Sequence, residues 1–165
     1  MKRLLLDTNI YGEMVVDSEL DVIKVSLLNH PSLIVFGSKI IRTELRATPK
    51  KIKIMGSNLR IDLLSLYDDV VKERVLDITP AMEALASDYY LLYKEVGGGD
   101  GKKEMYNDFL LVASASLKEM DIVISNDEST LKSNCALKAY YLVNTLKKIR
   151  VPQFINYKEF KALLG

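Results

Sequence analysis

The sequence is poor in the residues that build disulfide scaffolds and histidine-based catalytic sites. Its 165 residues include one cysteine, one histidine and no tryptophan. Cys135 has no second cysteine with which to form an intramolecular disulfide or a thiolate zinc site, so we expect a buried, inert thiol. His30 precedes a proline and suits a helix end. With a single histidine, Ser/His/Asp catalysis is not expected and multi-histidine metal sites are excluded. A metal site must therefore use oxygen ligands, which favour a hard cation.

The sequence also lacks long apolar runs and a strong excess of charge. No uncharged apolar stretch approaches the ~18 residues that span a membrane, and the run at residues 4–6 is too short for a signal peptide. These absences predict a cytoplasmic protein. A net charge of +1 provides no global field for nucleic acid, so such a partner needs a local basic patch.

Apolar segments of two kinds alternate along the chain. Short runs predict strands at 4–6, 33–36, 74–78, 121–124 and 153–156. Helical spacing predicts helices at about 10–30, from 40 to the proline at 49, and at 58–71, 80–96, 104–119, 135–149 and up to 164. This alternation favours an α/β fold, with a mostly parallel sheet of about five strands and helices on both faces. No repeat or long linker divides the chain, so we expect one domain over residues 1–165.

Two aspartates follow strands of the predicted sheet. The first strand ends at Asp7, and Asp127 comes just after the fourth. In open parallel sheets ligands bind at the carboxyl ends of the strands, so both side chains should project toward the same edge. Each could instead be a helix N-cap, because both are followed by residues that suit the start of a helix.

Two further acids are expected to face this edge from helices. Asp108 is the only charge between residues 108 and 117, and it lies at the border of a buried helix face near the N-terminal end. Glu44 follows the second strand, between Arg42 and Arg46. The alternatives are an ordinary acid near a helix start for Asp108 and a solvated side chain for Glu44.

Four carboxylates at one edge would repel one another and raise each other's pKa unless a cation neutralises them. A cluster of this kind without histidine is what one or two Mg²⁺ or Mn²⁺ ions require. The sequence therefore predicts a hard-cation site built from Asp7, Glu44, Asp108 and Asp127.

Four short segments occur in a particular order along the chain: Leu-Leu-Leu-Asp-Thr-Asn at 4–9, Arg-Thr-Glu-Leu at 42–45, Asn-Asp at 107–108 and Ser-Asn-Asp at 125–127. Together they resemble the PIN-domain nucleases, which include the VapC-like toxin ribonucleases. The resemblance runs from residue 4 to about 131. It implies a PIN-like fold, Mg²⁺- or Mn²⁺-dependent hydrolysis of RNA, a homodimer and, for a toxin, an antitoxin partner.

The resemblance also implies roles for individual residues. The catalytic and metal-binding acids would be Asp7, Glu44, Asp108 and Asp127, supported by Asn9 and Ser125. Many family members carry a further acid followed by phenylalanine after the last segment, whereas this chain has Thr130 and a leucine. This departure leaves the number of metal ions open.

The chain has one basic stretch close to these acids. Between residues 42 and 53 a single acid stands among five basic side chains that could hold a nucleic-acid backbone: Arg42, Arg46, Lys50, Lys51 and Lys53. A solvated surface is the alternative. The glycine-rich loop at 97–101 does not fit the phosphate-binding P-loop pattern and is interpreted as a mobile connection. The tyrosine pairs at 89–90 and 140–141, with Tyr93, favour packing or a subunit interface over base stacking.

Three other functions are compatible with parts of the pattern. A haloacid-dehalogenase-like phosphatase needs a second aspartate two residues after the first, where this chain has Asn9. A response-regulator receiver needs paired acids after the first strand and a lysine after a late strand, and neither is present. A PIN-like scaffold that binds RNA or protein without cleaving it remains open.

Overall fold

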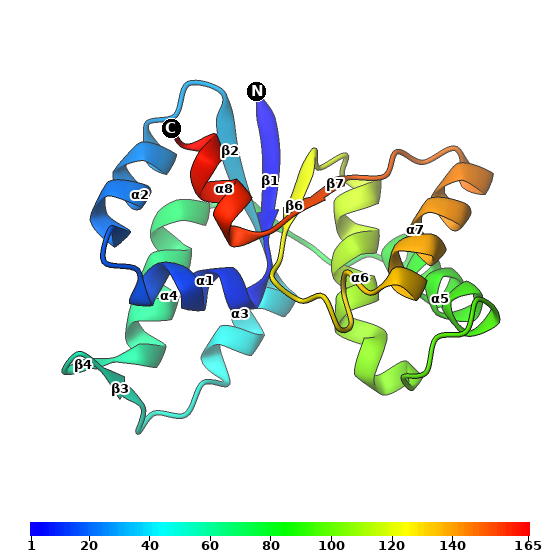
Figure 1. Ribbon diagram of the computed structural model, residues 1–165, viewed down its shortest axis with the longest axis horizontal. Coiled ribbons are helices and arrows are strands. Elements are labelled where there is room, and N and C mark those ends of the chain that lie inside the picture. Colours follow the sequence, from blue (N-terminus) through cyan, green and yellow to red (C-terminus); the bar gives the residue numbers. More distant parts are fainter.

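A computed structural model describes all 165 residues and shows a five-stranded parallel sheet (Figure 1). The strand order is β5-β2-β1-β6-β7. The strands are β1 (Lys2–Leu6), β2 (Leu33–Ser38), β5 (Val75–Leu76), β6 (Ile122–Ile124) and β7 (Gln153–Ile155). Because the first strand lies in the middle, the chain winds outward in both directions, and the winding reverses between β1 and β6. The prediction of a parallel α/β fold is confirmed.

Helices cover both faces of the sheet (Figure 1). One face carries α1 (Thr8–Val16), α2 (Leu20–Leu28), α3 (Lys39–Arg46), α4 (Leu59–Val71) and the final α8 (Tyr157–Leu163). The other face carries α5 (Pro80–Glu95), α6 (Lys102–Leu117) and α7 (Asn134–Lys147). None of the helices is long and apolar enough to cross a bilayer.

The prediction of a single helix over residues 10–30 is wrong, because the segment forms two helices, α1 and α2. The Asp17 carboxylate accepts the backbone N–H of Glu19 at 2.9 Å, and Tyr157 and Lys161 of α8 bind the same carboxylate. The side chain of Asp17 thus replaces a helical hydrogen bond and fixes a bend between α1 and α2.

Three smaller features also differ from expectation. A hairpin of β3 (Lys53–Ile54) and β4 (Ser57–Asn58) was not predicted; its turn places both Met55 and Gly56 at positive φ, 51° and 81°. The third strand of the sheet is reduced to two residues. Cys135 is half-buried rather than buried, with its thiol directed at the Val96 carbonyl.

The core is one cluster of 41 buried residues that draws on both faces of the sheet. All three residues of β6 are apolar and at most 2% exposed. Strands buried on both faces read as unbroken apolar runs, which is why they were recognisable in the sequence. The tyrosines pack against Phe109 of α6: its ring centroid lies 5.4 Å from Tyr93 and 5.8 Å from Tyr140. The packing interpretation of the tyrosines is confirmed for Tyr89, Tyr93 and Tyr140, which are all buried.

Candidate active site

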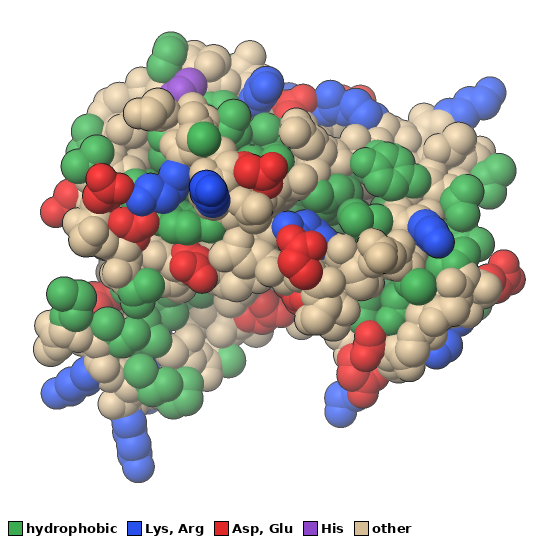
Figure 2. All heavy atoms as spheres, viewed as in Figure 1, with side chains coloured by type: hydrophobic (Ala, Val, Ile, Leu, Met, Phe, Trp, Pro, Cys, Tyr) green, Lys and Arg blue, Asp and Glu red, His purple; other side chains and the backbone are tan.

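The predicted acids lie at the carboxyl edge of the sheet where its winding reverses. Asp7 follows β1, and its backbone N–H donates to the carbonyl of Ile124, the last residue of the adjacent β6. At such a reversal the helices on either side diverge, and the edge is left open to a ligand. Figure 2 shows acidic atoms at the head of a notch between the lobe of α3, β3 and β4 and the lobe of α5 and α6.

Asp7 is buried and held by several donors. The carboxylate is 7% exposed, and it accepts the Thr8 N–H at 2.7 Å, the Ser125 hydroxyl at 2.7 Å and the Asn9 amide at 2.8 Å. Asp7 is therefore the N-cap of α1, as the alternative interpretation required. The bond from Ser125 ties Asp7 to the end of the adjacent strand β6, and a helix cap does not require this contact. Burial raises the pKa of Asp7, although the hydrogen bonds from Ser125 and Thr8 oppose the rise.

Glu44 is not a solvated side chain. One carboxylate oxygen accepts the hydroxyl of Thr8, and the other accepts the side-chain amide of Asn107 at 3.0 Å. These contacts join α1, α3 and α6 around one carboxylate. Thr8 and Asn107 had no assigned role in the sequence, because only the folded chain brings them to Glu44.

Asp127 caps the turn that follows β6. It accepts the N–H and hydroxyl of Ser129, both at 3.0 Å, the N–H of Thr130 at 2.8 Å and the hydroxyl of Thr130. Burial by itself would raise the pKa of Asp127, but the bonds from Thr130 and Ser129 outweigh it, so the pKa is lowered. Its N–H donates to the Ser125 hydroxyl at 3.0 Å, which connects the Asp127 turn to Asp7.

Asp108 shows that the four carboxylates influence one another. Burial and the charges of Asp7, Asp127 and Glu44 raise its pKa to about 7, against a hydrogen bond from Thr130 that lowers it. Without a cation, Asp108 is therefore partly protonated near neutral pH. The side chain of Thr130 stands where the PIN resemblance has a further acid, and its hydroxyl donates to Asp127.

The atoms with which these acids could ligate a metal are all carboxylate oxygens, which suit Mg²⁺ or Mn²⁺. A carboxylate can accept about four hydrogen bonds. Asp127 already receives four and Asp7 three, whereas Glu44 receives two. No three acids are arranged around one point as ligands of one ion. The residues fit a hard cation chemically, and Glu44 and Asp108 have the most free acceptor capacity.

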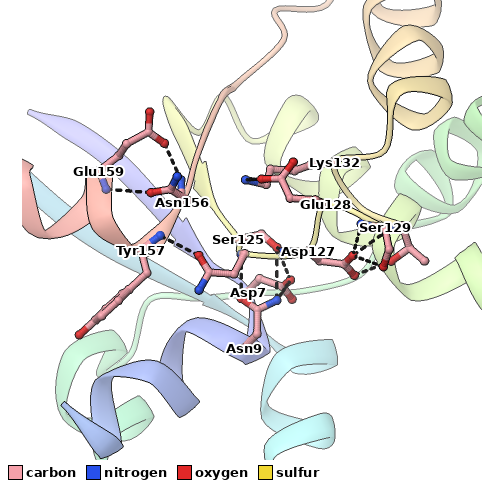
Figure 3. Close-up of polar contacts among 12 residues, drawn as sticks. Asp7, Asn9, Ser125, Asp127, Glu128, Ser129, Lys132, Asn156, Tyr157 and Glu159 are labelled. Atoms are coloured by element: carbon pink, nitrogen blue, oxygen red, sulfur yellow. Dashed lines mark hydrogen bonds and ion pairs between the residues drawn. The ribbon is translucent and has the colours of Figure 1, made fainter.

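The supporting residues Asn9 and Ser125 both contact Asp7 (Figure 3). Asn9 also contacts Asn126, to which the sequence analysis gave no role of its own. The Asn126 N–H donates to the Asn9 side-chain oxygen at 3.0 Å, and the Asn126 side-chain oxygen accepts the Tyr157 N–H at 2.9 Å. Asn126 thus fastens the start of α8 to the carboxylate edge. Beside this link, the buried Lys132 pairs with Glu128 at 2.6 Å.

The predicted basic residues do not act as one group. Arg42 makes two hydrogen bonds to the Asp68 carboxylate of α4, at 3.1 and 3.0 Å. This pairing occupies two of the three guanidinium nitrogens of Arg42. The other four are exposed and make no ion pair: Arg46, Lys50, Lys51 and Lys53.

The structure is similar to several solved complexes. One is VapBC2 from Rickettsia felis bound to a DNA fragment from its promoter, with 16% identity, 93% of this chain and 98% of that chain covered, and a TM-score of 0.59. A second is VapBC-1 from nontypeable Haemophilus influenzae, with 16% identity, coverages of 94% and 98%, and a TM-score of 0.59. A third is FitAcB from Neisseria gonorrhoeae, with 16% identity, coverages of 93% and 97%, and a TM-score of 0.55. The sequence matches no family model. It also matches no curated protein. At these identities the similarity establishes the fold.

Proposed function

The chain has the PIN-domain fold, and from this premise we propose that it is a metal-dependent endoribonuclease that hydrolyses RNA phosphodiester bonds. The catalytic and metal-binding residues in this proposal are Asp7, Glu44, Asp108 and Asp127. The observation that carries it is that four carboxylates lie at one edge of the sheet, close enough that burial and the charges of the other three raise the pKa of Asp108 to about 7. Such a concentration of negative charge is unfavourable unless a cation is part of the working site.

One or two Mg²⁺ or Mn²⁺ ions would supply a bound water of lowered pKa and stabilise the charge on the leaving oxygen. The chain's own residues position the acids. Ser125 and Asn9 orient Asp7, and Thr8 and Asn107 orient Glu44 from two different helices. Because Asp7 and Glu44 are fixed by donors from other elements, and Asp127 by the turn that follows it, these three carboxylates are preorganised for a ligand before one arrives.

The phosphatase alternative is not supported by the contacts of Asp7. A second acid would be needed two residues later, and Asn9 at that position donates its amide to Asp7. An amide has no proton to transfer to a leaving group at neutral pH. A scaffold that binds RNA without cleaving it has the same contacts as the nuclease, so activity must separate the two.

The test is cleavage of a labelled single-stranded RNA with Mg²⁺ or Mn²⁺, with and without EDTA. We expect cleavage that EDTA abolishes and that Asp7→Asn removes, because the substitution keeps the shape but takes one charge from the site. Asp21→Asn is a matched control, since Asp21 is an exposed acid in the first turn of α2. Single-stranded DNA of the same sequence tests the choice of RNA.

Cleavage by Asp7→Asn at the wild-type rate would show that the acids are misassigned. Unfolding of Asp7→Asn, measured as a lost melting transition, would show that Asp7 serves only as the cap of α1. RNA binding by the wild-type protein without cleavage under any metal would favour the scaffold.

We also propose two partners. The neighbours in fold are toxin–antitoxin complexes, which supports an antitoxin for this chain. For a homodimer, the best surface is a groove of about 380 Å³ between α5 and α7, next to Leu91 and Leu146, which are 64% and 82% exposed. We expect a dimer in sedimentation that Leu146→Glu dissociates; a wild-type monomer at micromolar concentrations would contradict it.

A further inference from the structure

A strongly basic segment directly follows the helix that carries Glu44. Between Leu45 and Ile61 the chain has five Lys or Arg and no acidic residue, in a protein whose net charge is +1. None of these side chains takes part in an ion pair: Arg46, Lys50, Lys51, Lys53 and Arg60. Unpaired cations gathered in one segment create a local positive potential that the protein as a whole lacks.

This segment contains the β3–β4 hairpin, which combines the cations with exposed apolar side chains. Met55 in the turn is 93% exposed and Ile52 is 40% exposed. The hairpin is nevertheless anchored, because the Asn58 amide donates to the Lys50 carbonyl at 2.9 Å and the Leu59 N–H donates to the Ile52 carbonyl at 3.1 Å. These apolar side chains are therefore held in an ordered hairpin, outside the core, where a ligand can reach them.

The lobe that carries the hairpin borders the notch at whose head the acidic atoms lie, and the hairpin forms the outer end of that lobe (Figures 1 and 2). In Figure 2, Lys and Arg side chains project from the lobe of α3, β3 and β4 on one side of the notch and from the lower edge of the α6 lobe on the other. On the α6 side, Lys102 and Lys103 are exposed in the first turn of the helix and make no ion pair. Basic groups thus lie on both sides of the notch, and those of α6 stand next to the acid Glu104 of the same turn.

We propose that the β3–β4 hairpin is a substrate arm that holds a single-stranded nucleic acid across the carboxylate edge, with Lys102 and Lys103 on the far side. This inference rests on the proposed nuclease function. The lysines of the arm bind backbone phosphates on one side of the bond to be cleaved, and Lys102 and Lys103 bind phosphates on the other side. Ile52 and Met55 lie against the faces of bases, which are accessible in a single strand and stacked away in a duplex.

The charge pattern favours nucleic acid over an acidic protein as the occupant. An acidic peptide would be drawn to the lysines and then repelled by the carboxylates that follow. A phosphate backbone meets the same carboxylates, but a divalent cation at the edge converts that repulsion into attraction. The cations also alternate with apolar side chains along the arm, which matches the alternation of phosphates and bases in a single strand.

The test is the affinity of a short fluorescent single-stranded RNA, measured by anisotropy in EDTA so that binding is separated from cleavage. The comparison between RNA and the acidic peptide is also made with Mg²⁺ present, because the preference for RNA depends on a cation at the edge. The arm variant is Lys50→Gln/Lys51→Gln/Lys53→Gln. Its matched control is Lys94→Gln/Lys138→Gln/Lys148→Gln, which removes three exposed lysines that make no ion pair on α5 and around α7. Single-stranded DNA and duplex RNA of the same sequence, and an acidic peptide, are the further probes.

We expect the arm variant to lose about ten- to a hundredfold in affinity at 0.1 M salt, and its log K–log salt slope to become shallower by about 2. The control should bind as the wild type does. Met55→Ser should weaken single-strand binding without changing the salt slope, because an apolar contact releases no counterions. Duplex RNA should bind more weakly than the single strand.

An equal loss in the arm variant and the control would overturn the proposal, as would unchanged binding by the arm variant. Tighter binding of the acidic peptide than of RNA would assign the hairpin to a protein partner instead. The nuclease proposal fails separately: if RNA binds through the arm but no metal supports cleavage, the arm stands and the catalytic assignment falls. If the arm variant binds RNA with unchanged affinity and cleaves it normally, the nuclease proposal stands and the proposal of a substrate arm falls.

Discussion

The two faces of the sheet differ in their balance of ion pairs and aromatic contacts, although each has both: Tyr11 packs on Tyr67 on one face, and Lys147 pairs with Asp88 on the other. The face that carries α1 to α4 and α8 is tied together by charged pairs between helices, among them Lys24 with Asp69, Arg42 with Asp68 and Lys161 with Asp17. The face that carries α5, α6 and α7 is packed around aromatic rings: Tyr89, Tyr90, Tyr93, Phe109 and Tyr140. Exposed ion pairs contribute little to stability, whereas buried aromatic packing contributes much.

This difference determines how each acid of the candidate site is held. Asp108 belongs to α6, directly before Phe109, so the aromatic core fixes its position. Glu44 belongs to α3 and is oriented by the Thr8 hydroxyl and the Asn107 amide. The site lies where the two faces meet, and it depends on apolar packing on one side and on side-chain hydrogen bonds on the other.

The largest effect should come from the aromatic face. Phe109→Ala removes a ring that is 1% exposed and packed against four tyrosines, so we expect a loss of about 3–5 kcal/mol of unfolding free energy. Urea unfolding measures this loss. Phe109→Leu is the control, because it retains much of the volume and should lose considerably less. Equal losses from the two substitutions would mean that ring packing does not support α6.

The second prediction concerns the pH dependence of the metal-free protein. The folded-state pKa of Asp108 is about 7, above its ordinary value of 3.8, so the folded state retains a proton that the unfolded state releases. This contribution to stability is complete below about pH 4 and is lost as the pH rises through about 7. Between pH 5 and 7.5 the loss should be about 2–3 kcal/mol.

Melting in EDTA at these two pH values measures the effect. Asp108→Asn cannot titrate and should show a much smaller difference, and Mg²⁺ should raise the wild-type melting temperature at pH 7.5. The same pH dependence in both proteins would show that Asp108 is not the group that retains the proton.

A third prediction concerns Asn126, which joins α8 to the carboxylate edge. Asn126→Ala removes the acceptor of the Tyr157 N–H and should cost about 1 kcal/mol. The alanine keeps the backbone N–H that binds Asn9, but without the bond to α8 the backbone of residue 126 is held less firmly beside Asn9 and Asp7. The substitution should therefore lower kcat several-fold with little change in KM, because the basic arm is untouched. Asn126→Asp keeps an acceptor and should restore most of the rate. A change confined to KM would place Asn126 outside the positioning of Asp7.

The smallest effect should come from the ion pairs of the other face. Arg42→Gln breaks the pair with the half-exposed Asp68 and should cost at most about 1 kcal/mol. It should leave RNA affinity unchanged, because Arg42 is committed to α4. Arg46→Gln is the contrasting variant, expected to weaken RNA binding without a change in stability. If Arg42→Gln weakens RNA binding as much as Arg46→Gln does, then Arg42 itself binds the substrate and gives up its pair with Asp68 to do so.

The elements that could be predicted from the sequence are those whose pattern is local. The apolar runs of β1 and β6 and the cap of α5 by Thr79 are encoded in neighbouring residues. The bend at Asp17 depends in part on partners in α8, 140 positions away, and the β3–β4 hairpin has strands of two residues, too short for a periodic pattern. Both were missed for these reasons.

The sequence by itself determined the parallel α/β architecture and the placement of Asp7 and Asp127 at one edge, because strand ends and their order follow from apolar periodicity and the acids sit immediately beyond them. Only the tertiary structure decided which donors hold each acid, that Arg42 is paired with Asp68, and that Asn126 reaches α8. These contacts join residues whose separation along the chain carries no pattern. Hydrogen bonds and burial depend on which residues are close in space, and these residues come together only when the helices pack on both faces of the sheet.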